Sequence, residues 1–233
     1  DTDSCFVNSK TESETKAEKI GKEIEKNIND FYNKFIKKEY NRDSFLELEF
    51  EKNYTRFLMP KIRSGKKGAK KRYAGLKKVD GKEEIETVGI ESVRSDWTEA
   101  AQVFQKELLD KIFHKQEIAN FVKKFIKEIY EGKYDNQLVY RKSIRKGLEE
   151  YQKTTPPHVK AARKLKKLDS NIIEYYITKE GPEPKQLLRH KLDYDHYIDK
   201  QIKPIAEMVL IFFNIKFDDL VKGSKQVNLF DFR

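Results

Sequence analysis

The feature that most constrains the fold is a change in the spacing of apolar residues along the chain. Over residues 15–36 they recur every three to four positions, which predicts an amphipathic helix packed on another part of the structure through one face. That face consists of Ile20, Ile24, Ile28, Phe31 and Phe35. Over residues 46–50 the spacing falls to two, because apolar residues alternate with glutamate, which predicts a half-buried strand. The strand is expected to continue through residues 54–59, and residues 1–7 predict another short strand.

A hairpin is expected after a loop of glycine and lysine at residues 61–69. Its arms are residues 70–76 and 84–88, and Asp80-Gly81 supplies the turn, because this pair tolerates the positive φ angles of two-residue turns. The loop at 61–69 is the expected boundary between an α/β piece and a mainly helical one.

Three further apolar stripes predict helices in the second piece. They cover residues 97–112, 118–129 and 198–212. Ser95 or Asp96 is expected to cap the first of them, with Trp97 in the core. The second is expected to end near Gly132, and Pro204 to bend the third. Shorter elements are predicted at residues 138–140 (strand), 157–168 (basic helix) and 172–178 (strand).

Composition narrows the class of protein. An aromatic content of 12 % argues against disorder, because disordered chains lack the bulky side chains that build a core. The net charge of +10 suits a polyanionic partner, and a solvated, lysine-rich surface is the alternative. The single cysteine, Cys5, rules out an internal disulfide framework and fits a reducing cytoplasm. No apolar run is long enough to span a bilayer, so no membrane partner is expected.

Asp1 and Asp3 are two residues apart, so on an extended strand both carboxylates point to one face. Two carboxylates on one face repel each other unless a cation lies between them, and hard divalent ions such as Mg²⁺ prefer such oxygen ligands. A polar chain start is the alternative interpretation of this pair.

Two basic clusters are candidates for phosphate binding. In the first, Lys70, Lys71 and Arg72 offer charge, and Tyr73 adds a flat apolar body with a hydrogen-bonding tip. The second cluster consists of Arg141, Lys142, Arg145, Lys146, Tyr151, His158, Lys160 and Arg163. His158 follows two prolines at a predicted helix start, where backbone amides and the ring can face a phosphate. A solvated basic surface is the alternative for both clusters.

Five motifs in order resemble family B DNA polymerases, and the resemblance covers essentially the whole chain. DTDS resembles the second half of motif C, and KKRYAGL resembles the KxY element that lies along the primer–template minor groove. The segments ETVGIESVRSDW, GLEEYQKTTPPHVKAARKL and LDYDHYIDKQIKPIAE resemble the palm-to-thumb connection, the thumb signature and its closing helix. LELEFEKNYTRFLMP looks close to the bacterial DNA polymerase II branch.

The resemblance implies an α/β palm fragment at residues 1–68, followed by a mainly α-helical thumb at 69–222. It implies that Asp3 and Asp1 are ligands of two Mg²⁺ ions in the addition of a deoxynucleoside triphosphate to a primer 3′ end. Motif A, the nucleotide-binding helix and the exonuclease motifs are absent from these residues, so a larger family B polymerase chain is the expected partner. The location implied is the cytoplasm, at the nucleoid. A two-chain enzyme, a trans-spliced half and a fragment all fit this pattern.

The last eleven residues, 223–233, are predicted to bind a sliding clamp through a tail hinged at Gly223. Gln226, Leu229 and Phe230 resemble the bacterial clamp-binding pentapeptide, and Gln226, Leu229 and Phe232 fit much of the archaeal and eukaryotic spacing. The alternative is a strand that folds back on the thumb. Two rival functions for the whole chain are a non-catalytic DNA-binding processivity module and a basic structural protein.

Overall fold

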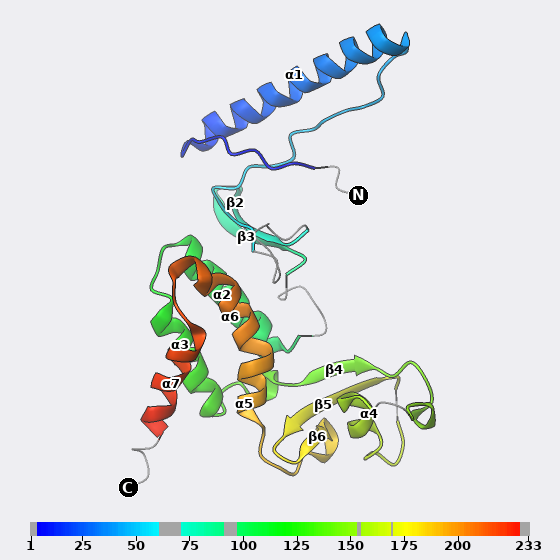
Figure 1. Cartoon of the computed structure of the whole chain (residues 1–233), viewed down its shortest axis with the longest axis vertical. Coiled ribbons are helices and arrows are strands. Elements are labelled where there is room, and N and C mark those ends of the chain that lie inside the picture. Colours follow the sequence, from blue (N-terminus) through cyan, green and yellow to red (C-terminus); the bar gives the residue numbers. More distant parts are fainter. Residues whose placement is uncertain (1–3, 61–70, 91–96, 153–154, 169, 229–233) are drawn as a thin grey trace. The chain divides into compact units, whose positions relative to one another are not determined.

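The computed structural model describes residues 4–60, 71–90, 97–152, 155–168 and 170–228, with side chains described as far as residue 222 (Figure 1). The chain forms two compact units. The first comprises residues 1–57 and 75–86, and the second comprises residues 58–74 and 87–233. The predicted class, a small α/β piece followed by a mainly helical one, is confirmed. No helix among the described residues has the length and apolar character needed to cross a membrane.

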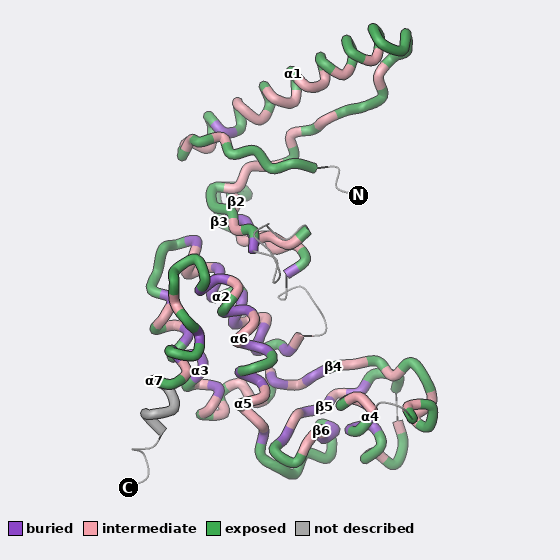
Figure 2. Tube along the Cα trace, in the orientation of Figure 1, coloured by how far each residue is buried: buried purple, intermediate pink, exposed green. Residues whose placement is uncertain are grey.

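The predicted first helix is confirmed as α1, Glu14–Tyr40. Ser13 caps its start, because the Ser13 hydroxyl accepts a hydrogen bond from the Lys16 amide. Asn41, with a φ of 50°, ends the helix in the left-handed conformation. Figure 2 shows how little of α1 is covered: Ala17 is its buried residue, and Phe31 and Phe35 are exposed.

The strand predicted at residues 46–50 is wrong. Figure 1 shows this segment returning beside α1, and its backbone bonds to helix side chains instead of to a neighbouring strand. Asn29 bonds both the amide and the carbonyl of Leu48, at 2.8 and 2.9 Å, and Glu25 accepts from the Phe50 amide at 2.8 Å. Residues 4–7 form no strand either, although the Phe6 ring packs 4.6 Å from that of Phe57.

A three-stranded sheet has the order β1 (Arg56–Leu58), β2 (Tyr73–Val79), β3 (Lys82–Val88). The predicted turn is confirmed, since Asp80 and Gly81 have φ angles of 51° and 75°, as a two-residue hairpin turn requires. The first arm begins at Tyr73, three residues later than predicted, and extends to Val79.

The second unit packs its helices around one apolar core. These are α2 (Glu99–Phe113), α3 (Ala119–Tyr130), α4 (Pro157–Ala162), α5 (Tyr194–Tyr197), α6 (Lys203–Leu210) and α7 (Phe217–Asn228). The core includes Phe104, Leu108, Val122, Phe125, Ile202 and Ile205, each at most 1 % exposed. Trp97 is only partly buried, at the edge of this core.

The caps and ends of these helices correct the sequence predictions in part. Thr98 caps α2, and the buried Gln201 carboxamide oxygen accepts from both the Thr98 amide and its hydroxyl. The predicted caps, Ser95 and Asp96, lie outside the described residues. The helix predicted at residues 157–168 is shorter, because α4 ends at Ala162.

The long helix predicted at residues 198–212 is interrupted on both sides of α6. A π turn, Ile198–Ile202, precedes α6, and the Lys203 amide bonds back to the Ile198 carbonyl. This wider turn comes directly before Pro204, which has no amide hydrogen to donate. A 3₁₀ turn, Ile211–Phe213, follows α6, and it leaves Phe212 exposed where the stripe predicted burial.

A second sheet has the order β4 (Tyr140–Ser143), β5 (Ile172–Thr178), β6 (Gly181–Pro184), and its strands are antiparallel. β5 is confirmed residue for residue, whereas β4 begins where the predicted strand 138–140 ends. β6 and α7 were not predicted. α4 packs against β5 and β6. The Tyr197 hydroxyl, fully buried, accepts from the Ile177 amide at 2.8 Å.

Glu183 in β6 organises the loop that follows the sheet. This carboxylate is 4 % exposed and accepts from the backbone amides of Arg189 and His190 and from the His190 ring. Burial alone would raise the pKa of Glu183, but the hydrogen bonds from Arg189 and His190 outweigh it and lower that pKa to about 2.

Replacing Glu183 with glutamine is therefore expected to destabilise the second unit by roughly 2 kcal/mol at pH 7, because the amide cannot accept all three bonds. The folded pKa lies below the ordinary value of 4.5, so the contribution is present above pH 4.5 and is lost as the pH falls toward about 2. Chemical denaturation at pH 7 and pH 3 measures the difference, with the exposed Glu180→Gln as control. An equal gap between variant and wild type at both pH values would contradict this role.

Candidate nucleic-acid interface

The second basic cluster of the sequence comes together on the β4–β5–β6 sheet, α4 and the loop between β4 and α4. β4 carries Arg141 and Lys142, which lie opposite Glu174 and Ile173 of β5. The loop carries Arg145, Lys146 and Tyr151, and α4 carries His158 and Lys160, with Arg163 as its C-cap. The eight predicted residues thus lie on β4, at α4 and its C-cap, and on the connection between them.

The loop between β4 and α4 is fixed at three points. The Ile144 amide donates to the Asn171 carbonyl at 2.7 Å, which extends the β4–β5 pairing by one bond. The Glu150 carboxylate accepts from the Gly147 amide at 2.9 Å, around the 3₁₀ turn Leu148–Glu150. Farther along, the Arg163 guanidinium donates to the Leu148 and Tyr151 carbonyls.

Ion pairs divide the basic residues of this cluster into two groups. Arg141 lies 3.2 Å from the Glu174 carboxylate, which also pairs with Lys185. In contrast, five cations form no ion pair with any carboxylate among the described residues. One of them, Arg163, donates to backbone carbonyls of its own loop, and the other four have no such bond within the described part. They are Lys142, Arg145, Lys146 and Lys160. We call these four the open cations, because no carboxylate of the described residues forms an ion pair with them.

The surroundings of His158 favour its neutral form. Burial lowers the pKa of its imidazole, and the nearby Lys142 ammonium lowers that pKa further. Its ring meets the Tyr151 ring edge to face, with centroids 6.4 Å apart. His158 can therefore offer a hydrogen bond to a phosphate, whereas the charge comes from Lys142 beside it.

The first basic cluster is less uniform than the sequence indicates. Lys70 lies outside the described residues, and Lys71 is exposed, in the left-handed conformation with a φ of 59°. Gly89 packs so closely on the Lys71 carbonyl that a Cβ atom would lie 2.1 Å from it, so this approach needs glycine. Arg72 is half-buried, and its guanidinium reaches the Met208 sulfur at 3.9 Å. Tyr73, also half-buried, begins β2.

The predicted catalytic and clamp-binding residues fall mostly outside the described part. Asp1 and Asp3 lie there, as do Leu229, Phe230 and Phe232. Gln226 is in the last turn of α7, which continues through Gly223, where the sequence predicts a hinge. No group of three or more potential metal ligands is found within the described residues.

Sequence reasoning missed two features of the interface. Lys166 and Lys167 are exposed in the turn that follows α4 and its C-cap Arg163 and, in the described part of the chain, have no carboxylate partner. The pair of adjacent lysines at the end of a basic helix was a usable signal. The ion pair between Arg141 and Glu174 depends on the register of two strands whose paired residues are 33 positions apart. No local sequence pattern could have predicted it.

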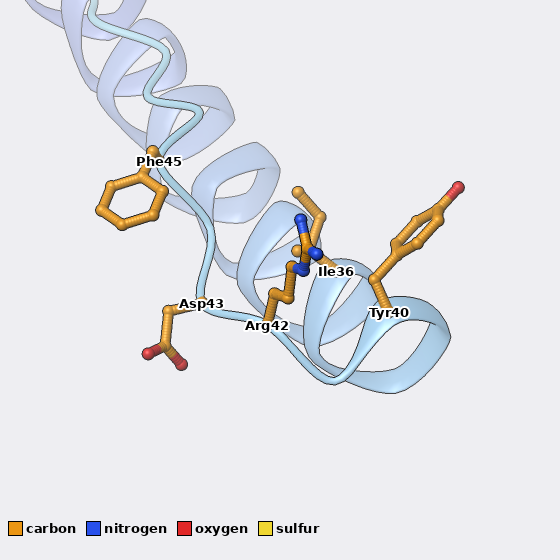
Figure 3. A pocket seen from close by; sticks show the side chains of 5 residues that line it. All are labelled: Ile36, Tyr40, Arg42, Asp43 and Phe45. Carbon is orange, nitrogen blue, oxygen red and sulfur yellow. The ribbon is translucent and has the colours of Figure 1, made fainter.

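A hollow in the first unit lies apart from this basic surface in the sequence. Figure 3 shows it at the C-terminal end of α1, lined by Ile36, Tyr40, Arg42, Asp43 and Phe45. Phe45 is 97 % exposed, so the hollow is open and its aromatic wall faces water. Ligand sites are enclosed and have polar groups directed at one point. This open hollow, with two charged and three apolar residues, does not have that arrangement.

Comparison with known proteins places these features in a wider context. The model of DNA polymerase family B matches residues 1–212. The chain is 41 % identical over 242 residues to DNA polymerase II of Escherichia coli K12, covering 99 % of this chain and 30 % of that protein. It is 33 % identical to DNA polymerase 2 of Aeropyrum pernix, covering 70 % of this chain and 22 % of the relative.

A solved structure is also similar. The family B DNA polymerase from Pyrobaculum calidifontis superposes with a TM-score of 0.55 at 28 % identity, covering 77 % of this chain and 24 % of that one. The chain therefore spans less than a third of the length of each of these relatives.

Proposed function

The chain belongs to DNA polymerase family B, and on that premise we propose that it supplies the DNA-gripping thumb and one corner of the palm for template-directed DNA synthesis. The observation that carries the proposal is the 41 % identity to a DNA polymerase II over 99 % of the chain, which includes the surface of open cations. In this proposal residues 1–68 are palm, residues 69–222 are thumb and residues 223–233 bind a sliding clamp.

Asp1 and Asp3 are the proposed ligands of two Mg²⁺ ions. The donor set fits these ions, because Mg²⁺ prefers carboxylate oxygens and neighbouring carboxylates repel each other unless a cation lies between them. When bound, the ions would stabilise the charge that develops on the attacking and leaving oxygens. The two aspartates of this chain hold and orient the ions, and an aspartate of motif A completes the site.

A larger family B polymerase chain is the proposed source of motif A, the nucleotide-binding helix and any exonuclease. The surface of α1 supports such a partner, because its aromatic side chains are exposed to an extent unusual for a helix with an apolar stripe. Phe31, Phe35 and Tyr40 are 57, 44 and 65 % exposed. A covering palm segment would remove these rings from water.

The thumb is proposed to hold the primer–template duplex through its phosphates. The four open cations and Lys71 present charge without reading bases, which suits a polymerase that must bind any sequence. Tyr73 and Arg72, at the start of β2, lie in the segment that resembles the KxY element.

Changing the four open cations together to glutamine is expected to weaken duplex binding at least about tenfold and to flatten its salt dependence. Each lost phosphate contact removes about 0.9 from the slope of log affinity against log salt. A titration of labelled primer–template between low and moderate salt measures both quantities. The matched control changes four exposed lysines of α1, Lys19, Lys22, Lys26 and Lys34, to glutamine and so removes the same charge elsewhere. If the slope of log affinity against log salt is the same for the two variants, the cluster is a solvated basic surface and not a DNA-binding one.

A further inference from the structure

Arg163 lies at the end of α4 and directs its side chain back into the preceding loop. One nitrogen, Nη2, donates to the Leu148 carbonyl at 2.7 Å and to the Tyr151 carbonyl at 3.2 Å. The other, Nη1, donates to the Thr155 hydroxyl at 3.4 Å, and that hydroxyl donates in turn to the Tyr151 carbonyl. The guanidinium therefore holds three separate positions of the loop at once.

These bonds distinguish Arg163 from the open cations. A residue that grips phosphate needs donors directed outward, whereas both terminal nitrogens of Arg163 are engaged with its own chain. The loop it holds carries Tyr151, whose ring packs against His158, and the 3₁₀ turn directly after Arg145 and Lys146.

We infer that Arg163 is a positioning residue, which fixes the loop between β4 and α4 so that Arg145, Lys146 and Tyr151 meet the duplex. The inference rests on the proposed function, because the loop must bind DNA for its position to matter. Arg145 and Lys146 lie between two other fixed points, the Ile144 amide and the Gly147–Glu150 bond. Arg163 fixes the C-terminal side of the same loop. The backbone that carries Arg145 and Lys146 is therefore ordered before DNA binds, which lowers the entropy cost of binding.

Arginine suits this geometry, because its planar fork places Nη2 on the two carbonyls and Nη1 on the Thr155 hydroxyl. Lysine has one ammonium on a shorter stem and cannot occupy both nitrogen positions. Replacement by lysine thus keeps the positive charge but loses part of the hydrogen bonding to the loop. It therefore distinguishes an arginine that binds phosphate from one that positions the loop.

The test compares Arg163→Lys and Arg163→Ala with the exposed Arg42→Lys of the first unit in duplex binding by the whole chain. We expect both Arg163 variants to lose affinity about fivefold, with raised amide hydrogen exchange at residues 148–151, whereas Arg42→Lys stays within about twofold of wild type. A phosphate-contacting Arg163 would give the opposite pattern: Arg163→Lys would keep its affinity, and Arg163→Ala alone would lower the salt slope by about 0.9.

Thr155→Val provides a second measurement that leaves every charge in place. It removes the hydroxyl that accepts from Arg163, so we expect amide exchange in the loop to rise and DNA binding to weaken about twofold. The inference therefore stays testable if the Arg163 variants do not fold. Unchanged amide exchange and unchanged DNA affinity in both Thr155→Val and Arg163→Lys would show that Arg163 does not position the loop. A different outcome is that the wild-type chain does not bind duplex DNA, although amide exchange in the loop still rises in the variants. That result would overturn the proposed function and the role of the loop in DNA binding, but the contacts of Arg163 with the loop would stand.

Discussion

Asp3→Ala is expected to lower nucleotide addition by at least about a thousandfold in the assembled polymerase and to leave primer–template affinity nearly unchanged. The expected size follows from the proposed role, because a metal ligand stabilises charge that develops in the transition state. The proposed contacts to the duplex lie elsewhere, on the open cations. Steady-state primer extension and duplex titration measure the two effects separately.

The matched control for this variant is Glu12→Ala, which removes one exposed carboxylate from the same unit. It should leave both activity and affinity at the wild-type level. Primer extension by Asp3→Ala within tenfold of wild type would show that Asp3 is not a metal ligand. A parallel loss of duplex binding would instead indicate that the substitution disturbs the fold.

The second large effect is expected at the C-terminal tail. Changing Leu229 and Phe230 to alanine should weaken binding to a sliding clamp at least about a hundredfold and eliminate clamp-stimulated synthesis of long products. Apolar anchors supply most of the affinity of such short peptides, because they fill the pockets on the partner surface. Extension of short primers without the clamp should be unaffected, because the tail has no proposed role in chemistry.

Surface plasmon resonance with immobilised clamp, together with extension on long and short templates, measures this prediction. Gln226→Ala is a graded comparison, since it removes one hydrogen-bonding anchor and leaves the apolar ones. If the Leu229 and Phe230 variant loses short-primer extension to the same extent as clamp-dependent synthesis, the tail packs on the thumb and contributes to its folding.

The features that the sequence predicted correctly depend on neighbouring residues. α1 follows from an apolar stripe at helical spacing, and the β2–β3 turn follows from Asp80-Gly81 alone. β5 follows from a run of β-branched and aromatic residues. In each of these cases the local signal and the tertiary context favour the same structure.

The features that the sequence did not predict depend on partners far along the chain. Residues 46–50 have the pattern of a strand, but their hydrogen-bonding partners are Asn29 and Glu25 on a helix. Gln201 reaches α2 across 103 residues, and no local pattern indicates it as part of that helix cap. The π turn Ile198–Ile202 interrupts the helical period ahead of α6, where the apolar stripe by itself predicts an unbroken helix.

The candidate site shows the same division. Residue type and spacing predicted the eight members of the second basic cluster, and their binding to DNA stays a prediction. Which of them are available to DNA depends on strand register for Arg141 and on loop geometry for Arg163, both of which need the fold. The aspartates and the tail, in contrast, are still assigned through the resemblance of their motifs.

Mg²⁺-dependent primer extension, with and without a larger family B polymerase chain that carries motif A and the nucleotide-binding helix, tests the central claim most directly. We predict that this chain alone binds duplex DNA but adds no nucleotide, since Asp1 and Asp3 cannot hold two hard ions unaided. Mixed with the larger chain, it should form a stoichiometric complex, cover the aromatic face of α1 and extend primers. Robust synthesis by this chain alone, or a stable complex inactive with every divalent metal, would contradict the account.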